Sequence, residues 1–258
     1  MRRVVCVRDG AVLWFSFLFM AVFIFDAGAF GRNDSETGGE MLKLGEKGAI
    51  IQRDKETYAI APHIPCGVVT PDMLRKLADA AEKYKAQAMK ITSATRIAIV
   101  GLKEEDIDGV WKDLGMAPGA AVGLCVRSVR TCPGTTFCKM GQQDALGMGM
   151  KLDAKYHGVD LPGKFKMAVS GCHINCAESW VRDLGLFGKP KGWTLVIGGN
   201  VGMSPRIAQE LAADLSDEEA LEMIQRVIAY YKGTATKGER LGKMIDRVGF
   251  DQVKAALR

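Results

Sequence analysis

The sequence predicts an α+β fold in which two consecutive units follow an apolar leader. Two observations carry this prediction. Residues 58–114 alternate strand-like runs with amphipathic helical segments, and four cysteines in two close pairs lie between residues 131 and 176 among further strand-like runs. The 258 residues suffice for one large domain or two small ones. We expect a leader over residues 1–40, a first unit over 41–120 and a second over 121–258.

The leader has the composition of a secretory signal. Arg2 and Arg3 precede an apolar run over residues 11–25, and small residues follow at 27–29. That run is short for a membrane span, which needs about 20 residues. Export or membrane anchoring is therefore one interpretation. We favour the other, in which translation starts at Met41 and the protein is cytoplasmic, because clustered thiols indicate a metal centre in a reducing compartment.

The first unit is predicted from local signals. A strand broken by Pro62 and Pro65 is expected over residues 58–69, and a helix should follow with Thr70 as its N-cap and Pro71 at its first position. Two short strands over 89–92 and 97–100 and a helix over 104–114 complete it. The order strand, helix, strand, helix favours a ferredoxin-like α+β unit.

The second unit is predicted to be mixed α/β. A strand over residues 165–169 leads into the second cysteine pair, and a capping box of Ser216 and Glu219 opens a late helix. The other expected elements are a strand over 122–126 with Cys125, a helix over 142–156, strands over 184–187 and 194–197, a glycine-rich turn over 198–202, and helices over 239–248 and 251–257.

The cysteine pairs indicate a metal centre. Cys132 and Cys138 are spaced as Cys-x5-Cys, and Cys172 and Cys176 as Cys-x3-Cys. Four thiolates from two loops can hold a four-iron cluster. Zinc pairs are normally spaced by two to four residues, so the first pair does not fit the usual zinc pattern. From spacing alone, structural zinc and free buried thiols stay open as alternatives.

Several motifs occur together in the order found in the siroheme-containing sulfite and nitrite reductases, and the chain resembles that family from about residue 55 to its end. The motifs are Cys132-Pro133-Gly134, Cys138, Lys164-Phe165-Lys166 and the run from Ser170 to Cys176. Larger members carry this unit twice in tandem, whereas this sequence has one copy. The resemblance implies siroheme and a 4Fe–4S cluster held by the four cysteines, with Cys176 also ligating the siroheme iron.

The resemblance also implies an anion-binding site of basic residues. Lys164 and Lys166 alternate on one predicted strand, so their side chains should share a face. Arg127-Ser128-Val129 resembles the family's Arg-Asn-Val segment with serine for asparagine, which leaves Arg127 and Arg130 as alternatives for one role. The expected catalytic residues are Arg96, Arg127, Lys164 and Lys166. The expected cofactor contacts are Cys176, Arg130, Thr135, Thr136, Asn175, Gly199, Asn200 and Arg206. Solvated surface charge is the alternative for each basic residue.

The activity that these features imply is a six-electron reduction of sulfite to sulfide, with nitrite as the alternative substrate. An electron-transfer module that holds only the cluster is a second possibility, and a zinc-stabilised binding module a third. The sequence has no flavin or nicotinamide motif, so we expect a separate electron-donor protein such as a ferredoxin. A net charge of +5 without a basic run interleaved with aromatics predicts no nucleic-acid partner. Two chains could pair as a homodimer to replace the missing repeat.

Overall fold

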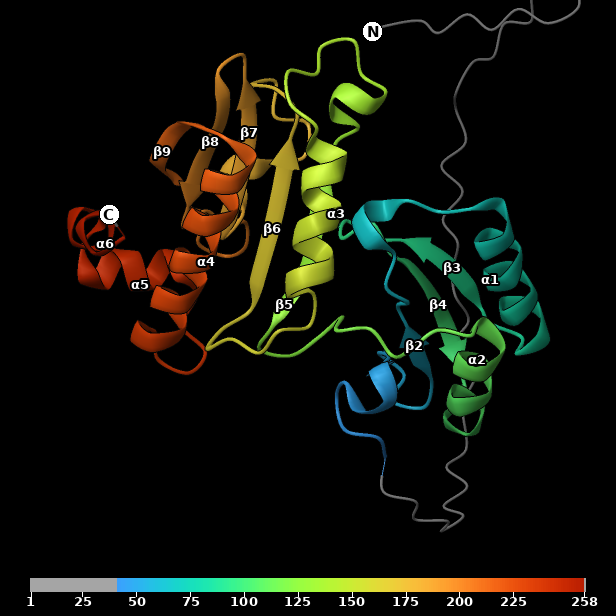
Figure 1. Cartoon of the computed structure of the whole chain (residues 1–258). Helices are drawn as coiled ribbons and strands as arrows, with labels where there is room; N and C mark the ends of the chain where they lie inside the picture. Colours follow the sequence, from blue (N-terminus) through green and yellow to red (C-terminus); the bar gives the residue numbers. More distant parts are fainter. Residues whose placement is uncertain (1–40, 258) are drawn as a thin grey trace, which may run out of the picture. The chain divides into compact units, whose positions relative to one another are not determined.

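Each of two α+β units is built on its own sheet (Figure 1). The computed structural model describes residues 41–257. The predictions about residues 1–40 lie outside this range. Within the described range, no helix is long and apolar enough to cross a membrane.

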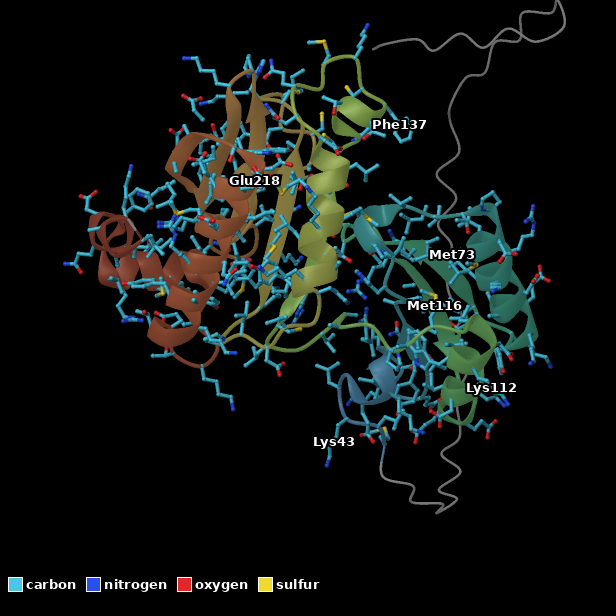
Figure 2. The ribbon with its side chains drawn as sticks, in the orientation of Figure 1. Lys43, Met73, Lys112, Met116, Phe137 and Glu218 are labelled. Atoms are coloured by element: carbon cyan, nitrogen blue, oxygen red, sulfur yellow. The ribbon has the colours of Figure 1, made fainter. Side chains whose placement is uncertain are left out.

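The first unit contains an antiparallel sheet with strand order β1-β2-β4-β3. Leu77 of α1 and Trp111 of α2 pack with Ile60 and Ile99 of the sheet in one hydrophobic core, and Met73 lies at its edge (Figure 2). The elements are β1 (Ala49–Ile51), β2 (Tyr58–Ile60), η2 (Pro65–Gly67), α1 (Pro71–Lys83), β3 (Ala88–Ile91), β4 (Ile97–Leu102) and α2 (Ile107–Leu114), with short 3-10 turns η1 (Glu46–Gly48) and η3 (Glu104–Asp106).

The helix start predicted at Pro71 is confirmed, because Thr70 Oγ1 accepts a hydrogen bond from Met73 N at 3.1 Å. The strand predicted over residues 58–69 with breaks at Pro62 and Pro65 forms only as far as Ile60, the last residue of β2, and its continuation beyond the prolines is wrong. The following segment contains two prolines, which have no N–H to donate to a sheet, and it turns through the short 3-10 segment η2 instead.

The second unit has a mixed sheet of order β5-β6-β7-β8-β9. The first three strands are parallel, and β8 and β9 continue the sheet antiparallel. Residues of α3, α4 and α5 pack with the strands in one core. The elements are β5 (Val126–Thr131), η4 (Gly134–Thr136), α3 (Ala145–Tyr156), β6 (Phe165–Ser170), η5 (Ser179–Val181), β7 (Leu184–Lys189), β8 (Gly192–Ile197), β9 (Gln209–Leu215), α4 (Asp217–Thr234), α5 (Leu241–Val248) and α6 (Phe250–Ala256).

Three details of this unit differ from the prediction. The strand expected over residues 122–126 begins only at Val126, and β9 had not been predicted. The helix expected from residue 142 begins at Ala145, because Gln142 and Gln143 donate their N–H groups to Gly171 O instead. The capping box of α4 is confirmed, since the Ser216 and Glu219 side chains each accept from the other's backbone N–H.

A buried arginine connects the two units. Arg96, at 3% exposure, donates from its guanidinium to Ala61 O at 2.9 Å, to Ala120 O at 3.4 Å and to Arg127 O at 2.7 Å. The guanidinium thus fastens the start of β5 to the first unit. Hydrogen bonds to charged groups contribute about 1.5–3 kcal/mol each, so this residue holds the backbone that carries Arg127.

Histidine 157, at the end of α3, should make the protein sensitive to acid. Its pKa is lowered to about 4, mainly by burial and in part by His63 and Arg96, against an opposing effect of Asp153. The unfolded residue takes up a proton near pH 6.5, whereas the folded one does so near pH 4. The stability that neutral His157 contributes is therefore present above about pH 6.5 and is lost as the pH falls towards 4.

We therefore expect the free energy of unfolding of His157→Gln to fall less than that of the wild type between pH 6.5 and pH 4. Urea unfolding of the loaded protein at closely spaced pH values measures this difference. Parallel curves for the two proteins would show that His157 does not carry the acid sensitivity.

Candidate active site

Two adjacent parallel strands bring the cysteine pairs together. Cys132 directly follows β5, and Cys172 lies two residues after β6. Cys132 N donates to Val169 O at 3.2 Å, which extends the ladder between the strands, and Gly171 N donates to Cys132 Sγ at 3.0 Å. The carboxyl ends of parallel strands lie at one edge of a sheet, so both cysteine loops start from the same place.

Glycine at two positions allows these loops to approach closely. A Cβ atom on Gly171 would lie 2.6 Å from Gly134 Cα, and Gly134 itself has a φ of +57°. Only a residue without a side chain fits such a contact, and a positive φ also favours glycine. Thr135, a predicted cofactor contact, donates its N–H to Gln143 O at 3.2 Å within this packed region.

The second loop is shaped by Asn175, which has a left-handed φ of +62°. Its Oδ1 accepts from Ser170 Oγ at 3.0 Å and from Ser179 N at 2.7 Å. Thr136 similarly uses its hydroxyl to donate to Asp144 Oδ1 at 3.2 Å. Both side chains, predicted as cofactor contacts, therefore organise the loops that carry the cysteines. Their contact with a cofactor stays a prediction.

The loops present thiols at different depths. Cys172 is buried and Cys132 half-buried, whereas Cys138 and Cys176 are exposed. Apolar residues beside the exposed thiols are themselves uncovered. Phe137 is 80% exposed (Figure 2) and Ile174 is 53% exposed. An apolar edge around open thiols is suited to contact a cofactor or a protein partner.

Three of the predicted basic residues lie within electrostatic reach of one another. Burial lowers the pKa of Lys164, and Arg127 and Arg240 lower it further. Burial also lowers the pKa of Lys166, with Lys164, Arg182 and Arg240 adding to the effect. A neighbouring cation disfavours a second positive charge, so these shifts reflect a group of cations gathered beside β6. We call Arg127, Lys164, Lys166, Arg182 and Arg240 the cation cluster.

Arg182 and Arg240 are members of this cluster that the sequence did not identify. Arg240 donates from Nε to Asp183 Oδ1 at 3.0 Å and from Nη2 to Oδ2 at 2.6 Å, and Lys166 N donates to Oδ2 at 2.8 Å. Asp183 is fully buried. This carboxylate fixes Arg240 and the strand of Lys166 together. The one sequence feature that could have pointed to this group was the adjacent pair Arg182-Asp183, which precedes an apolar strand.

A second carboxylate, Glu178, pairs with Arg182 of the cluster and with Arg130. Arg130 Nη1 lies 2.7 Å from Glu178 Oε2, and the Arg182 guanidinium contacts the same oxygen. Arg182 Nε is buried and has no hydrogen-bond partner in the described residues. Glu178 and Asp183 thus balance only part of the positive charge, and an orphaned buried donor is available for an anionic group.

The other residues predicted to contact a cofactor make hydrogen bonds or close packing contacts within the protein. Arg206 donates to Asp246 Oδ1 at 2.9 Å and to Gly198 O at 2.9 Å. Asn200 and Arg206 exchange two backbone hydrogen bonds at 2.9 Å and close the glycine-rich turn. A Cβ on Gly199 would lie 2.4 Å from Trp180 O, so packing alone requires glycine there. Cofactor contact by these residues stays a prediction.

The residues present fit both cofactors that the sequence implied. Soft thiolates from two neighbouring loops form the donor set of an iron–sulfur cluster. The cation cluster exceeds the neighbouring carboxylates in charge, as binding of a carboxylate-rich macrocycle and a small anion requires. The orphaned Arg182 Nε is a donor of the kind that such an anionic group would satisfy.

Family models match both units. The nitrite/sulfite reductase ferredoxin-like half domain matches residues 50–117, and the nitrite and sulphite reductase 4Fe-4S domain matches residues 122–258. The chain belongs to the nitrite and sulfite reductase family. Membership in this family confirms the oxidoreductase class, and it makes siroheme and a 4Fe–4S cluster the cofactors.

Relatives within the family include both kinds of reductase. An assimilatory-type sulfite reductase of Nitratidesulfovibrio vulgaris is 44% identical over 211 residues, which cover 82% of this chain and 97% of the relative. An NAD(P)H nitrite reductase of Bacillus subtilis is 42% identical over 209 residues, which cover 81% of this chain and 26% of the relative. This chain therefore spans about a quarter of that nitrite reductase.

Two solved structures confirm the fold class. Mycobacterium tuberculosis NirA superposes with a TM-score of 0.69 at 20% identity, covering 78% of this chain and 39% of that chain. Dissimilatory sulfite reductase I gives a TM-score of 0.69 at 16% identity, covering 78% of this chain and 69% of that chain. At such identities the likeness concerns the fold alone.

Proposed function

We propose that this reductase is an assimilatory-type sulfite reductase that converts sulfite to sulfide. The observation that carries the proposal is the 44% identity to a sulfite reductase along 97% of that relative's length. Nitrite is the second candidate substrate, favoured by the 42% identity to a nitrite reductase, although the match covers 26% of that longer protein. Both substrates are small anions and suit the cation cluster.

The cation cluster would bind and protonate the substrate. Siroheme and the 4Fe–4S cluster, when bound, supply the electrons and the iron at which the anion reacts. Lys164, Lys166 and Arg127 neutralise the anion's charge, and Asp183 holds Arg240 in position beside them. Because the pKa of each lysine is lowered, its ammonium gives up a proton more readily to a departing oxygen.

The four cysteines would hold the iron–sulfur cluster, with Cys176 shared with the siroheme iron. Phe137 and Ile174 form an apolar edge beside exposed thiols, which supports docking of a separate electron-donor protein such as a ferredoxin. A module that only transfers electrons is disfavoured, since it has no need for uncompensated cations beside β6. Pairing of two chains stays a prediction.

The substrate assignment is tested by steady-state turnover. Protein loaded with both cofactors is assayed anaerobically with a chemically reduced viologen dye and with sulfite or nitrite. We expect a higher kcat/KM for sulfite, with sulfide as the product. A higher kcat/KM for nitrite, with ammonia as the product, would make the protein a nitrite reductase. Turnover of neither anion by fully loaded protein would favour the electron-transfer module.

Arg127→Met and Arg130→Met should separate the two arginines that the sequence left as alternatives. Arg130 is already paired with Glu178, whereas the Arg127 side chain, among residues 41–257, donates only to a backbone carbonyl, Gly123 O at 2.9 Å. The positive charge of Arg127 is therefore available to bind an anion. We expect Arg127→Met to lower kcat/KM for sulfite about ten- to a hundredfold, as the loss of one charged hydrogen bond predicts. Arg130→Met should have a smaller effect, and the reverse order would place Arg130 at the anion.

A further inference from the structure

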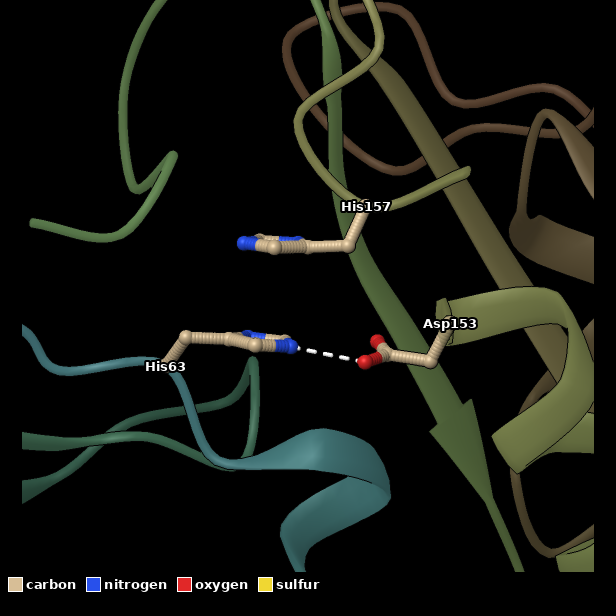
Figure 3. A group of neighbouring side chains, drawn as sticks. All are labelled: His63, Asp153 and His157. Carbon is tan, nitrogen blue, oxygen red and sulfur yellow. Dashed lines mark hydrogen bonds and ion pairs between the residues drawn. The ribbon is translucent and has the colours of Figure 1, made fainter. Parts of the chain in front are cut away.

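Three ionisable side chains outside the cation cluster meet where the first unit contacts the second (Figure 3). His63 comes from the segment between β2 and η2, and Asp153 and His157 come from the end of α3. His63 Nε2 lies 2.7 Å from Asp153 Oδ2. One ligand atom of each residue lies within 4.8 Å of the other two.

Helical spacing and burial make this trio more than a chance contact. Asp153 and His157 are four positions apart, so both side chains leave the same face of the helix end. Asp153 is only 4% exposed. Its Oδ1 and the Nδ1 of His157 are buried, and neither has a hydrogen-bond partner within residues 41–257. Leaving such buried polar atoms unpaired costs free energy, so the site needs a partner.

We propose that His63, Asp153 and His157 bind a divalent transition-metal cation that joins the two units. Two imidazoles and one carboxylate form a donor set that suits zinc with an open fourth position, or non-haem iron(II). The unpaired Asp153 Oδ1 is a free ligand atom for this ion. The inference rests on this trio alone and is independent of which anion the enzyme reduces.

Metal binding requires one of the two histidine rings to rotate. The His63 and His157 rings are stacked, with centroids 3.5 Å apart and planes inclined by 3°. A metal binds in the plane of an imidazole, and no point lies in both of two parallel planes. One ring must therefore turn about its Cβ–Cγ bond. Metal–nitrogen bonds of about 2.0–2.1 Å then set the spacing of the ligand atoms, and the ion replaces the direct contact between His63 Nε2 and Asp153 Oδ2.

The neighbouring charges set the character of the site. The buried Nδ1 of His157 has no hydrogen-bond partner among the described residues, so it can serve as a ligand atom. Arg96 acts electrostatically on both Asp153 and His157 and opposes a cation. The pKa of the nearby Cys66 thiol is raised to about 12, mainly by burial and in part by Asp153. Cys66 therefore stays protonated and is not a fourth ligand, which leaves the fourth position open to solvent or an exogenous ligand.

Calorimetric titration tests the proposal on protein that carries both of its cofactors, because empty cysteine loops would themselves take up metal. The protein is freed of loosely held metal and titrated anaerobically with Zn²⁺ and, in a second arm, with Fe²⁺. We expect one saturable site per chain, with Zn²⁺ binding more tightly than Fe²⁺ as the general order of divalent-metal affinities requires. At a hundredfold excess over Kd, the ion should raise Tm by about 5–10 °C.

Asp153→Asn and His157→Gln should each weaken binding at least about a hundredfold, since even an outer partner of a metal ligand contributes 10–100-fold. Asp160→Asn is the matched control, because it removes an exposed carboxylate near the same helix end and should bind as the wild type does. Absence of a saturable site, or unchanged binding by both ligand variants, overturns the proposal. Should either variant fail to fold, anomalous scattering from Zn²⁺-soaked wild-type crystals decides, and metal density away from the trio overturns it.

Discussion

Cys176→Ser should abolish sulfite turnover and remove the coupling between the two cofactors. Cys176 closes the second cysteine loop, where Asn175 has a left-handed backbone and ties the loop to Ser170 and Ser179. The loop therefore fixes where the thiol lies. Serine offers a hard oxygen in place of the soft thiolate that iron–sulfur ligation requires. We expect turnover at the background level of the dye alone.

Three measurements check this result. Iron and acid-labile sulfide contents report the cluster, and the visible spectrum reports siroheme. Cys125→Ser makes the same chemical change at a buried cysteine outside the four-cysteine pattern, and it should keep both cofactors. Normal siroheme ligation in Cys176→Ser would mean that another residue bridges the two centres.

Lys164→Met and Lys166→Met should each lower sulfite turnover about ten- to a hundredfold, because a charge-assisted contact contributes roughly 1.5–3 kcal/mol. Methionine keeps the length of the side chain and removes its charge. The backbone of β6 should persist, since Lys166 binds Asp183 through its N–H at 2.8 Å rather than through its side chain. The siroheme spectrum should therefore survive while kcat/KM falls.

Lys191→Met is the matched control for these variants. Lys191 lies exposed in the turn between β7 and β8, so its loss should leave turnover unchanged. Because the cations of the cluster repel one another, we also expect Lys166→Met to keep or raise Tm. Full turnover by both cluster variants with cofactors bound would remove the anion site from Lys164 and Lys166 and favour the electron-transfer module.

Local interactions made parts of the fold predictable from the sequence. The N-cap of α1 and the capping box of α4 each involve residues three positions apart. Such contacts depend on side chains and backbone groups within one helical turn. The residue types at these positions therefore show where both helices begin, and both starts are confirmed.

Elements that depend on distant partners were predicted less well. The start of α3 is delayed because Gln142 and Gln143 bind Gly171 O, which belongs to the second cysteine loop. Strand β9 lies at an edge of the sheet and is paired only with β8. Its charged residues and alanines do not alternate clearly, so the sheet rather than the local sequence makes it a strand.

The sequence alone identified the four cysteines and the Lys164-Phe165-Lys166 run as site residues. It also indicated the family, because these features depend on residue type and spacing. The tertiary structure determined which other charged side chains lie beside these residues. It brings Arg240 to Asp183 across 57 positions of sequence, and it commits the Arg96 guanidinium to three backbone carbonyls. A charge reaches a ligand only if folding leaves it unpaired and points it there, and pairing between residues far apart in the chain is fixed by packing rather than by any local pattern.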